Sequence, residues 1–201
     1  TGTLAGEIHY VHDGNYMMFK TSNSEAMRID SNGHLILKKN LALDTSTSEG
    51  IDFGAAGSSA NTLGDYEEGS FTPTFGGSGG NQTVSYSVQL GTYVKVGKLI
   101  YINVSVIATG TPSGGSGDLL INGLPFSSKS GVQQAGAIAF ANNLSFGSSG
   151  TQGGCNIEGG VSYLNVNSQE LSGTSSMSRV PASGIHNSAP RIVCSIVYEV
   201  A

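Results

Sequence analysis

Five polar or aromatic residues in the second half of the sequence could bind a sugar. They lie in or beside segments predicted to connect strands and are Asn142, Asn143, Tyr163, His186 and Asn187. Amide groups exchange hydrogen bonds with hydroxyl groups, and an aromatic ring can cover the face of a sugar. From Ser70 onward the chain carries four acidic and five basic residues, and this near-neutral balance suits an uncharged glycan. The alternative is that these residues belong to ordinary solvated loops.

The acidic residues give little support for catalysis. Glycan cleavage requires two carboxylates placed about one glycosidic bond, whereas the four acids after Ser70 are widely spaced in the sequence. No Ser/His/Asp order with a Gly-x-Ser-x-Gly nucleophile elbow is predicted. The sequence therefore predicts a binding protein without catalytic residues or a cofactor. A polysaccharide depolymerase whose active site lies between subunits is the alternative.

The histidines and cysteines do not form metal-binding patterns. His9 and His12 are three residues apart, which in a strand places them on opposite faces, and His34 follows a turn. No metal site is predicted. Cys194 lies in an alternating apolar run and is predicted to be a small buried side chain rather than half of a disulfide with Cys155.

The composition is that of an all-β protein. The 201 residues include 30 glycines and no tryptophan, and only 11% are charged. The apolar runs are short, alternating and rich in Val, Ile and Thr, as in strands. No Lys/Arg cluster indicates a nucleic-acid partner, and no apolar run approaches the length of a membrane span.

The first third of the chain predicts two hairpins. Residues 7–12 and 16–21 flank Asp13-Gly14-Asn15, and residues 27–30 and 34–37 flank Ser31-Asn32-Gly33. Asn-Gly and Asp-Gly are strong hairpin-turn signals.

These short runs cannot bury their own apolar faces, and no cysteine precedes Cys155. A small region of this kind needs a partner for stability. We therefore predict an intertwined trimeric stem in which three copies share one core. Its predicted core residues are Ile29, Leu35, Leu37, Leu43 and Phe53.

The remainder predicts a β-rich head. Strands are expected at residues 71–75, 83–88, 92–96, 99–109, 119–122, 136–141, 162–166 and 191–200. Turn signals recur at short intervals, which favours a β-sandwich, specifically a jelly roll. The polar segment Asp65–Gly69 reads as a junction, so the predicted domains are a stem over residues 1–69 and a head over residues 70–201.

Four motifs resemble one known family. Met27–Gly33, Asp65–Thr74, Gly91–Lys98 and Ile121–Phe126 resemble, in this order, the C-terminal part of bacteriophage tail fibre and tailspike-associated proteins. The resemblance implies a homotrimeric fibre in the virion, made in the host bacterial cytoplasm and joined to upstream tail or fibre proteins. It also implies a head that recognises a host surface receptor, for which a polysaccharide is the expected class. A module that only registers the three chains during assembly is a further alternative.

Overall fold

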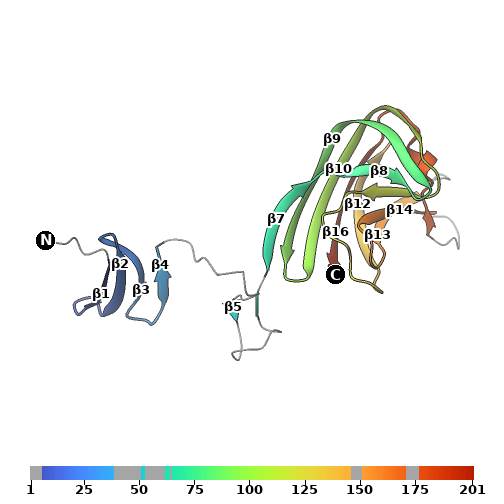
Figure 1. Ribbon diagram of the computed structural model, residues 1–201. Coiled ribbons are helices and arrows are strands. Elements are labelled where there is room, and N and C mark those ends of the chain that lie inside the picture. The colour runs from blue at the N-terminus through green and yellow to red at the C-terminus, as the bar shows by residue number, and fades with distance from the viewer. Residues whose placement is uncertain (1–5, 39–50, 53–61, 64, 146–150, 171–176) are drawn as a thin grey trace. The chain divides into compact units, whose positions relative to one another are not determined.

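The computed structural model describes residues 6–38, 51–52, 62–63, 65–145, 151–170 and 177–201. The chain divides into two compact units, Thr1–Gly50 and Ile51–Ala201. The N-terminal unit holds a four-stranded antiparallel sheet, and the C-terminal unit is built around a larger, closed sheet (Figure 1). The predicted boundary after Gly69 falls inside strand β7 (Tyr66–Phe71), so the sheet of the head begins before the predicted domain boundary.

Turn residues with positive φ angles connect the strands of the N-terminal sheet. Its strands are β1 (Gly6–Val11), β2 (Tyr16–Thr21), β3 (Ser24–Ile29) and β4 (Leu35–Leu37). Asn15 (φ 48°) lies in the first turn, and Gly33 (φ 82°) lies in the last. The Asp30 carboxylate accepts the backbone N–H groups of His34 and Asn32, each at 2.9 Å, and these bonds lower the pKa of Asp30. Both predicted hairpins are confirmed.

One face of the N-terminal sheet is apolar. The register pairs Ile8 with Phe19 and Ile29 with Leu35, and paired residues point to the same side of a sheet. Eight side chains share this side, which we call the stem face: Ile8, Tyr10, Met17, Phe19, Met27, Ile29, Leu35 and Leu37. Ile8 is 72% exposed and Leu35 is 60% exposed in the single chain. The opposite face carries ion pairs, including Lys20 with Glu7.

The stem face contains three of the predicted core residues, Ile29, Leu35 and Leu37. The other two, Leu43 and Phe53, lie outside the described residues. The remaining five members of the face come from β1, β2 and the first part of β3.

The C-terminal unit is a barrel-like sheet of antiparallel strands. Its strands are β7, β8 (Thr74–Gly77), β9 (Gly80–Val96), β10 (Leu99–Gly114), β11 (Leu119–Asn122), β12 (Gln134–Asn142), β13 (Thr151–Ile157), β14 (Tyr163–Glu170), β15 (Ser178–Arg179) and β16 (Arg191–Glu199). The order β10-β16-β12-β13-β14-β11-β8-β9 closes because β9 also pairs with β10. A short 3-10 helix, η3 (Ala182–Ile185), precedes β16, and β5 (Ile51–Asp52) pairs with β6 (Thr62–Leu63).

The all-β prediction is confirmed, and the closed order refines it. Opposing walls pack face to face around one core, as in a sandwich, but they belong to one continuous sheet. The strand order does not establish the predicted jelly-roll connectivity. Strands β10 and β16 supply much of the core, in which Ile102, Val106 and Ile192 have no exposed surface.

Two of the family-like motifs form adjacent strands whose glycines and aromatic rings are paired. β7 pairs with β9 so that Gly69 lies opposite Tyr93 and Phe71 lies opposite Gly91. A Cβ atom at Gly91 would lie 2.4 Å from the ring of Phe71, and one at Gly69 would lie 2.8 Å from the ring of Tyr93. Each glycine therefore leaves the space that the ring on the neighbouring strand occupies.

Replacing Gly91 by Ala should destabilise the barrel by about 1–3 kcal/mol, because the Phe71 ring must leave its place against the core. Thermal unfolding followed by circular dichroism measures this effect. Thr92→Ala on the exposed side of the same strand is the control and should change stability by less than about 0.5 kcal/mol. Equal melting temperatures of the two variants would show that the Phe71 ring can move without a loss of stability.

A third motif joins the same cluster. The ring centroids of Phe126 and Tyr93 are 5.4 Å apart at an interplanar angle of 80°. The buried Lys95 places its Nζ atom 5.5 Å from the Phe126 ring centroid and forms an ion pair with Asp65. The hydroxyl of Tyr198 donates a 2.8 Å hydrogen bond to the Phe126 carbonyl, and burial raises the pKa of Tyr198 to about 12. The family-like residues thus build the part of the barrel where the chain enters.

The two cysteines are buried thiols. Cys194 is 1% exposed, which confirms its prediction as a small core residue. Cys155 on β13 and Cys194 on β16 face each other across β12, where Gly136 leaves room for the sulfur of Cys155. The Cys194 thiol donates a hydrogen bond to Cys155, and this bond together with burial raises the pKa of Cys194. Two strand spacings separate their Cα atoms by about 9–10 Å, beyond the reach of a disulfide.

Candidate functional site

The preceding chain joins the barrel at one of its two ends, which we call the entry end. At the entry end, Tyr66 pairs with Val96, and Leu99 pairs with Glu199. At the opposite end, which we call the far end, Arg191 pairs with Ile107 on one side and with Asn142 on the other. Ligand contacts at the far end would therefore lie away from the point where the preceding chain joins the barrel.

The structure brings four of the five predicted sugar-binding residues together at the far end. Asn142 ends β12 and Asn143 follows it, and His186 and Asn187 follow η3. The segments touch directly, because the backbone N–H of Ser145 donates to the carbonyl of Gly184 at 2.8 Å. These four residues form the candidate site.

Tyr163 does not belong to this group. It begins β14 and pairs with Asn122 on β11. Two residues before it, Val161 donates its backbone N–H to the hydroxyl of Ser128, which forms a bridge to Val200 at the entry end. Separating Tyr163 from the other four would have required the strand order, which the sequence does not give.

Two of the four side chains hold the loops in place. The Asn143 amide donates to the carbonyl of Ser188 at 2.6 Å, and Asn143 itself has a φ angle of 56°. The Asn187 amide donates to the hydroxyl of Ser145 at 3.2 Å and to the carbonyl of Gly184 at 3.3 Å. Their alanine variants would therefore disturb the loops as well as any ligand contact, contrary to the expectation that they are free to bind.

His186 ties the far end to the base of the long β9–β10 hairpin. Its Nε2 atom lies 3.0 Å from the carbonyl oxygen of Gly114 and 3.2 Å from Oε1 of Gln82. Both partners are acceptors, so Nε2 carries the proton. The Gln82 amide in turn donates to the carbonyl of Ala182 at 2.6 Å, which fixes its orientation.

Asn142 is the most available member of the candidate site. Its side chain is exposed, and its Oδ1 atom accepts the backbone N–H of Asn143 at 3.0 Å. Among the described residues its amide N–H groups have no protein partner. On the neighbouring position of β16, the guanidinium of Arg191 lies 4.8 Å from the ring centroid of Phe140, which is 48% exposed. The far end thus offers hydrogen-bonding amides beside an aromatic ring.

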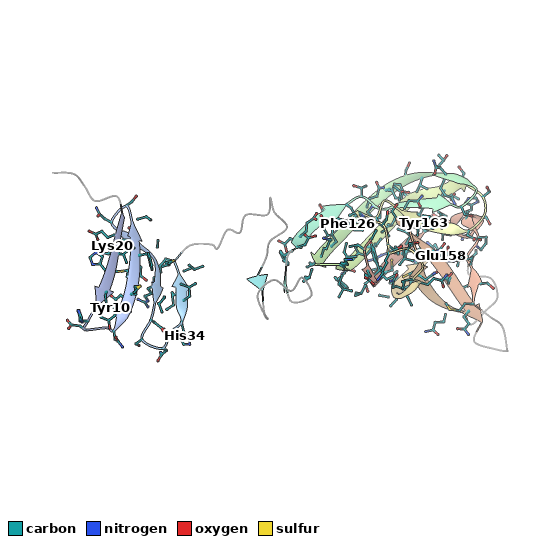
Figure 2. All side chains as sticks on the ribbon, turned by 60° about the horizontal axis from the view of Figure 1, so that its bottom comes forward. Tyr10, Lys20, His34, Phe126, Glu158 and Tyr163 are labelled. Carbon is teal, nitrogen blue, oxygen red and sulfur yellow. The ribbon has the colours of Figure 1, made fainter. Side chains whose placement is uncertain are left out.

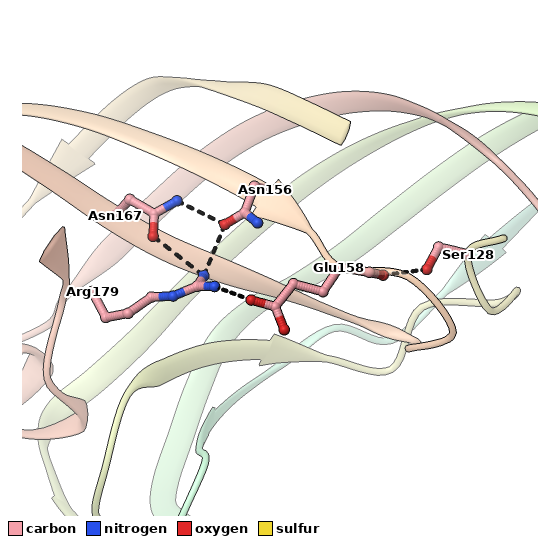
Figure 3. A network of polar contacts seen from close by, with 5 residues as sticks. All are labelled: Ser128, Asn156, Glu158, Asn167 and Arg179. Atoms are coloured by element: carbon pink, nitrogen blue, oxygen red, sulfur yellow. Dashed lines mark hydrogen bonds and ion pairs between the residues drawn. The ribbon is translucent and has the colours of Figure 1, made fainter. Parts of the chain in front are cut away.

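A polar network of four side chains lies elsewhere in the barrel and was not predicted. Arg179 donates to Oδ1 of Asn156 at 2.8 Å and to Oδ1 of Asn167 at 3.3 Å, and it forms an ion pair with Glu158 (Figure 3). The Asn167 amide donates to Asn156 at 2.8 Å. Because each of the four side chains bonds another, the network fastens the short strand β15 to β13 and β14. The sequence alone does not indicate it, since the pairing of β13, β14 and β15 brings its members together.

The described residues contain no group of three His, Cys, Asp or Glu side chains that could hold a metal ion. The same part of the chain forms no helix that is long and apolar enough to cross a membrane.

The comparisons with known proteins point to one fold. No family model and no curated protein matches the chain. Among solved structures, the crystal structure of the Dettilon tailspike protein (gp208) is similar over 68% of this chain, with 22% sequence identity and a TM-score of 0.55. This chain spans 24% of the length of that protein. The fold is therefore one that is found in a phage tailspike.

Proposed function

We propose that this chain is the receptor-binding end of a phage tail fibre or tailspike, a homotrimer in the virion that binds a host surface polysaccharide. Upstream tail or fibre proteins would join it on the N-terminal side. The similarity to a tailspike fold and the order of the four family-like motifs support this role.

The observation that carries the proposal is the position of the candidate site. Four predicted residues from two separate segments meet at the far end of the barrel, away from β7. Loops held by a rigid scaffold are the usual place for binding residues. A homotrimer would present three such sites, and their combined avidity compensates for shallow contacts.

The stem face supports the homotrimer. A four-stranded sheet with eight apolar side chains on one side requires a cover, since isolated small sheets are marginal in water. The face has no charged side chain, so a copy of itself is a suitable partner. Figure 2 draws the side chains of this sheet, with Tyr10 among the labelled members.

The barrel carries a second apolar surface suited to the same assembly. We call it the barrel patch, and it lies on the outer side of β7, β9, β10 and β16. Its members are Tyr66, Leu90, Val94, Val96, Leu99, Tyr101 and Val197, which are 38–64% exposed. Contiguous exposed apolar residues of this kind mark interaction surfaces.

We propose binding without cleavage. Two of the head's acids have structural partners at or near the entry end: Glu158 pairs with Arg179, and Glu199 pairs with Lys129 at 2.7 Å. Neither is available beside the candidate site. Incubation with purified host polysaccharide should release no new reducing ends, and their appearance would favour the depolymerase.

Asn142→Ala should weaken binding to susceptible cells about tenfold while leaving folding unchanged, because the side chain is exposed and its amide N–H groups have no partner among the described residues. Flow cytometry with the fluorescently labelled protein over a panel of bacterial strains measures this binding. Asn32→Ala, in an exposed turn of the N-terminal unit, is the matched control. If Asn142→Ala and Asn142→Arg both bind cells as well as the parent, the receptor site is elsewhere on the barrel.

A further inference from the structure

The barrel wall opens between two neighbouring strands. Residues Gln134–Ala137 of β12 pair with residues Gly154–Ile157 of β13. The pairing stops there, although β12 continues to Asn142 and β13 begins at Thr151. Within these described strands, residues 138–142 and 151–153 form no ladder with each other. Each is paired on its other side, with β16 or with β14. Their facing edges therefore present backbone N–H and C=O groups to the opening.

The opening is a pocket of about 360 Å³ whose lining is uncharged. The amide side chains of Gln152 and Gln169 lie directly opposite each other on β13 and β14. Met177 reaches over Gly154, where a Cβ atom would lie 3.3 Å from its terminal methyl group. The pocket thus combines amide donors and acceptors with an apolar thioether and with small residues, Gly136, Ala137, Gly153 and Gly154, beside Ile138.

We propose that this pocket binds an uncharged, hydroxyl-rich segment of a polysaccharide. The inference rests on the proposed function and adds to it a second contact, on the barrel wall, with a defined class of sugar. Each sugar hydroxyl both donates and accepts, and backbone edges and amides offer both kinds of partner. A uronic or sialic acid would bring a carboxylate to a site without a cation.

The position of the pocket fits a continuous binding surface. It opens along the part of β12 that leads to Asn142 at the far end. The strands that form it, β12, β13 and β14, are not those that carry the barrel patch. The contacts that another subunit makes with the barrel patch would therefore not cover the pocket.

Surface plasmon resonance of the full chain tests the proposal. The immobilised probes are the uncharged polysaccharides dextran, mannan and galactan and the acidic polysaccharides alginate and polygalacturonate. We expect binding to at least one uncharged probe, with less than about a twofold change in affinity between about 50 and 500 mM NaCl. The Gln152→Ala/Gln169→Ala double variant should bind it at least about tenfold more weakly. Ala137→Leu, which fills the pocket without removing an amide, should do the same.

Gln133→Ala, in the exposed segment just before β12, is the matched control and should bind like the parent. Unchanged binding by the double variant, preference for the acidic probes, or no binding to any probe would each overturn this inference. Cell binding by the Asn142 variants decides the proposed function separately. Loss of cell binding with Asn142→Arg but not with the glutamine variants would leave the proposed function standing without this pocket.

Discussion

Replacing Ile29 and Tyr101 together by aspartate should convert the proposed trimer into monomers of 20.5 kDa. Ile29 lies on a central strand of the stem face, between Met17 and Leu35, and Tyr101 lies in the barrel patch between Val94 and Val197. Each change would bury three unpaired carboxylates in apolar contacts, at several kcal/mol apiece in rough terms. Each single variant should dissociate at lower temperature than the parent.

Light scattering coupled to size-exclusion chromatography measures the mass. The matched control is Ile36→Asp, because Ile36 lies on the opposite face of the N-terminal sheet beside Arg28 and should tolerate a carboxylate there. Circular dichroism checks that the barrel remains folded. A double variant that keeps the mass of three chains would show that neither apolar surface holds the subunits together.

The second large effect should come from Arg179→Met. The change removes the donor to Oδ1 of Asn167, one of the two donors to Oδ1 of Asn156, and the partner of Glu158. One acceptor buried without a partner costs about 1–3 kcal/mol and an exposed ion pair adds little, so we expect the barrel to lose about 1–3 kcal/mol of stability. Unfolding in guanidinium at fixed protein concentration, followed by tyrosine fluorescence, measures this loss, since the chain has no tryptophan.

Lys129→Met provides the comparison for that experiment. It also removes one side of a Lys/Arg–Glu pair, but Lys129 is 48% exposed and its partner Glu199 is 34% exposed. Exposed pairs contribute about 0–1 kcal/mol. Equal losses of stability for Arg179→Met and Lys129→Met would mean that the hydrogen bonds of Arg179 to the two asparagines add nothing to its ion pair.

The sequence predicts local structure well where a turn residue decides it. The hairpin turns at Asn15 and Gly33 follow from side chains that tolerate positive φ, and Gly97 (φ 58°) marks the tight β9–β10 turn in the same way. β13 escaped prediction because Gly153 and Gly154 interrupt its alternating pattern. The segment before Thr92 likewise reads as separate pieces, although β9 runs unbroken for 17 residues.

The candidate site depends on long-range pairing, which the sequence does not supply. Asn142 and Asn187 meet because β12 pairs with β16, and residue types alone do not give this pairing. Tyr163 shares the expected chemistry but begins a strand at the other end of the barrel. The pocket between β12 and β13 is still less visible, because it comes from a ladder that stops after Ala137.

The self-contained core of the barrel has a consequence for the timing of assembly. Every side chain in that core comes from one chain, and strands as distant in sequence as those of Leu99 and Glu199 must find each other to close it. Such non-local pairing is slow, but its rate does not depend on how many copies are present. The stem face, in contrast, can be covered only after chains collide, a step that accelerates with concentration. We expect finished barrels with unassembled stem faces to accumulate at low protein concentration, and the proposed trimers to form once the concentration has risen.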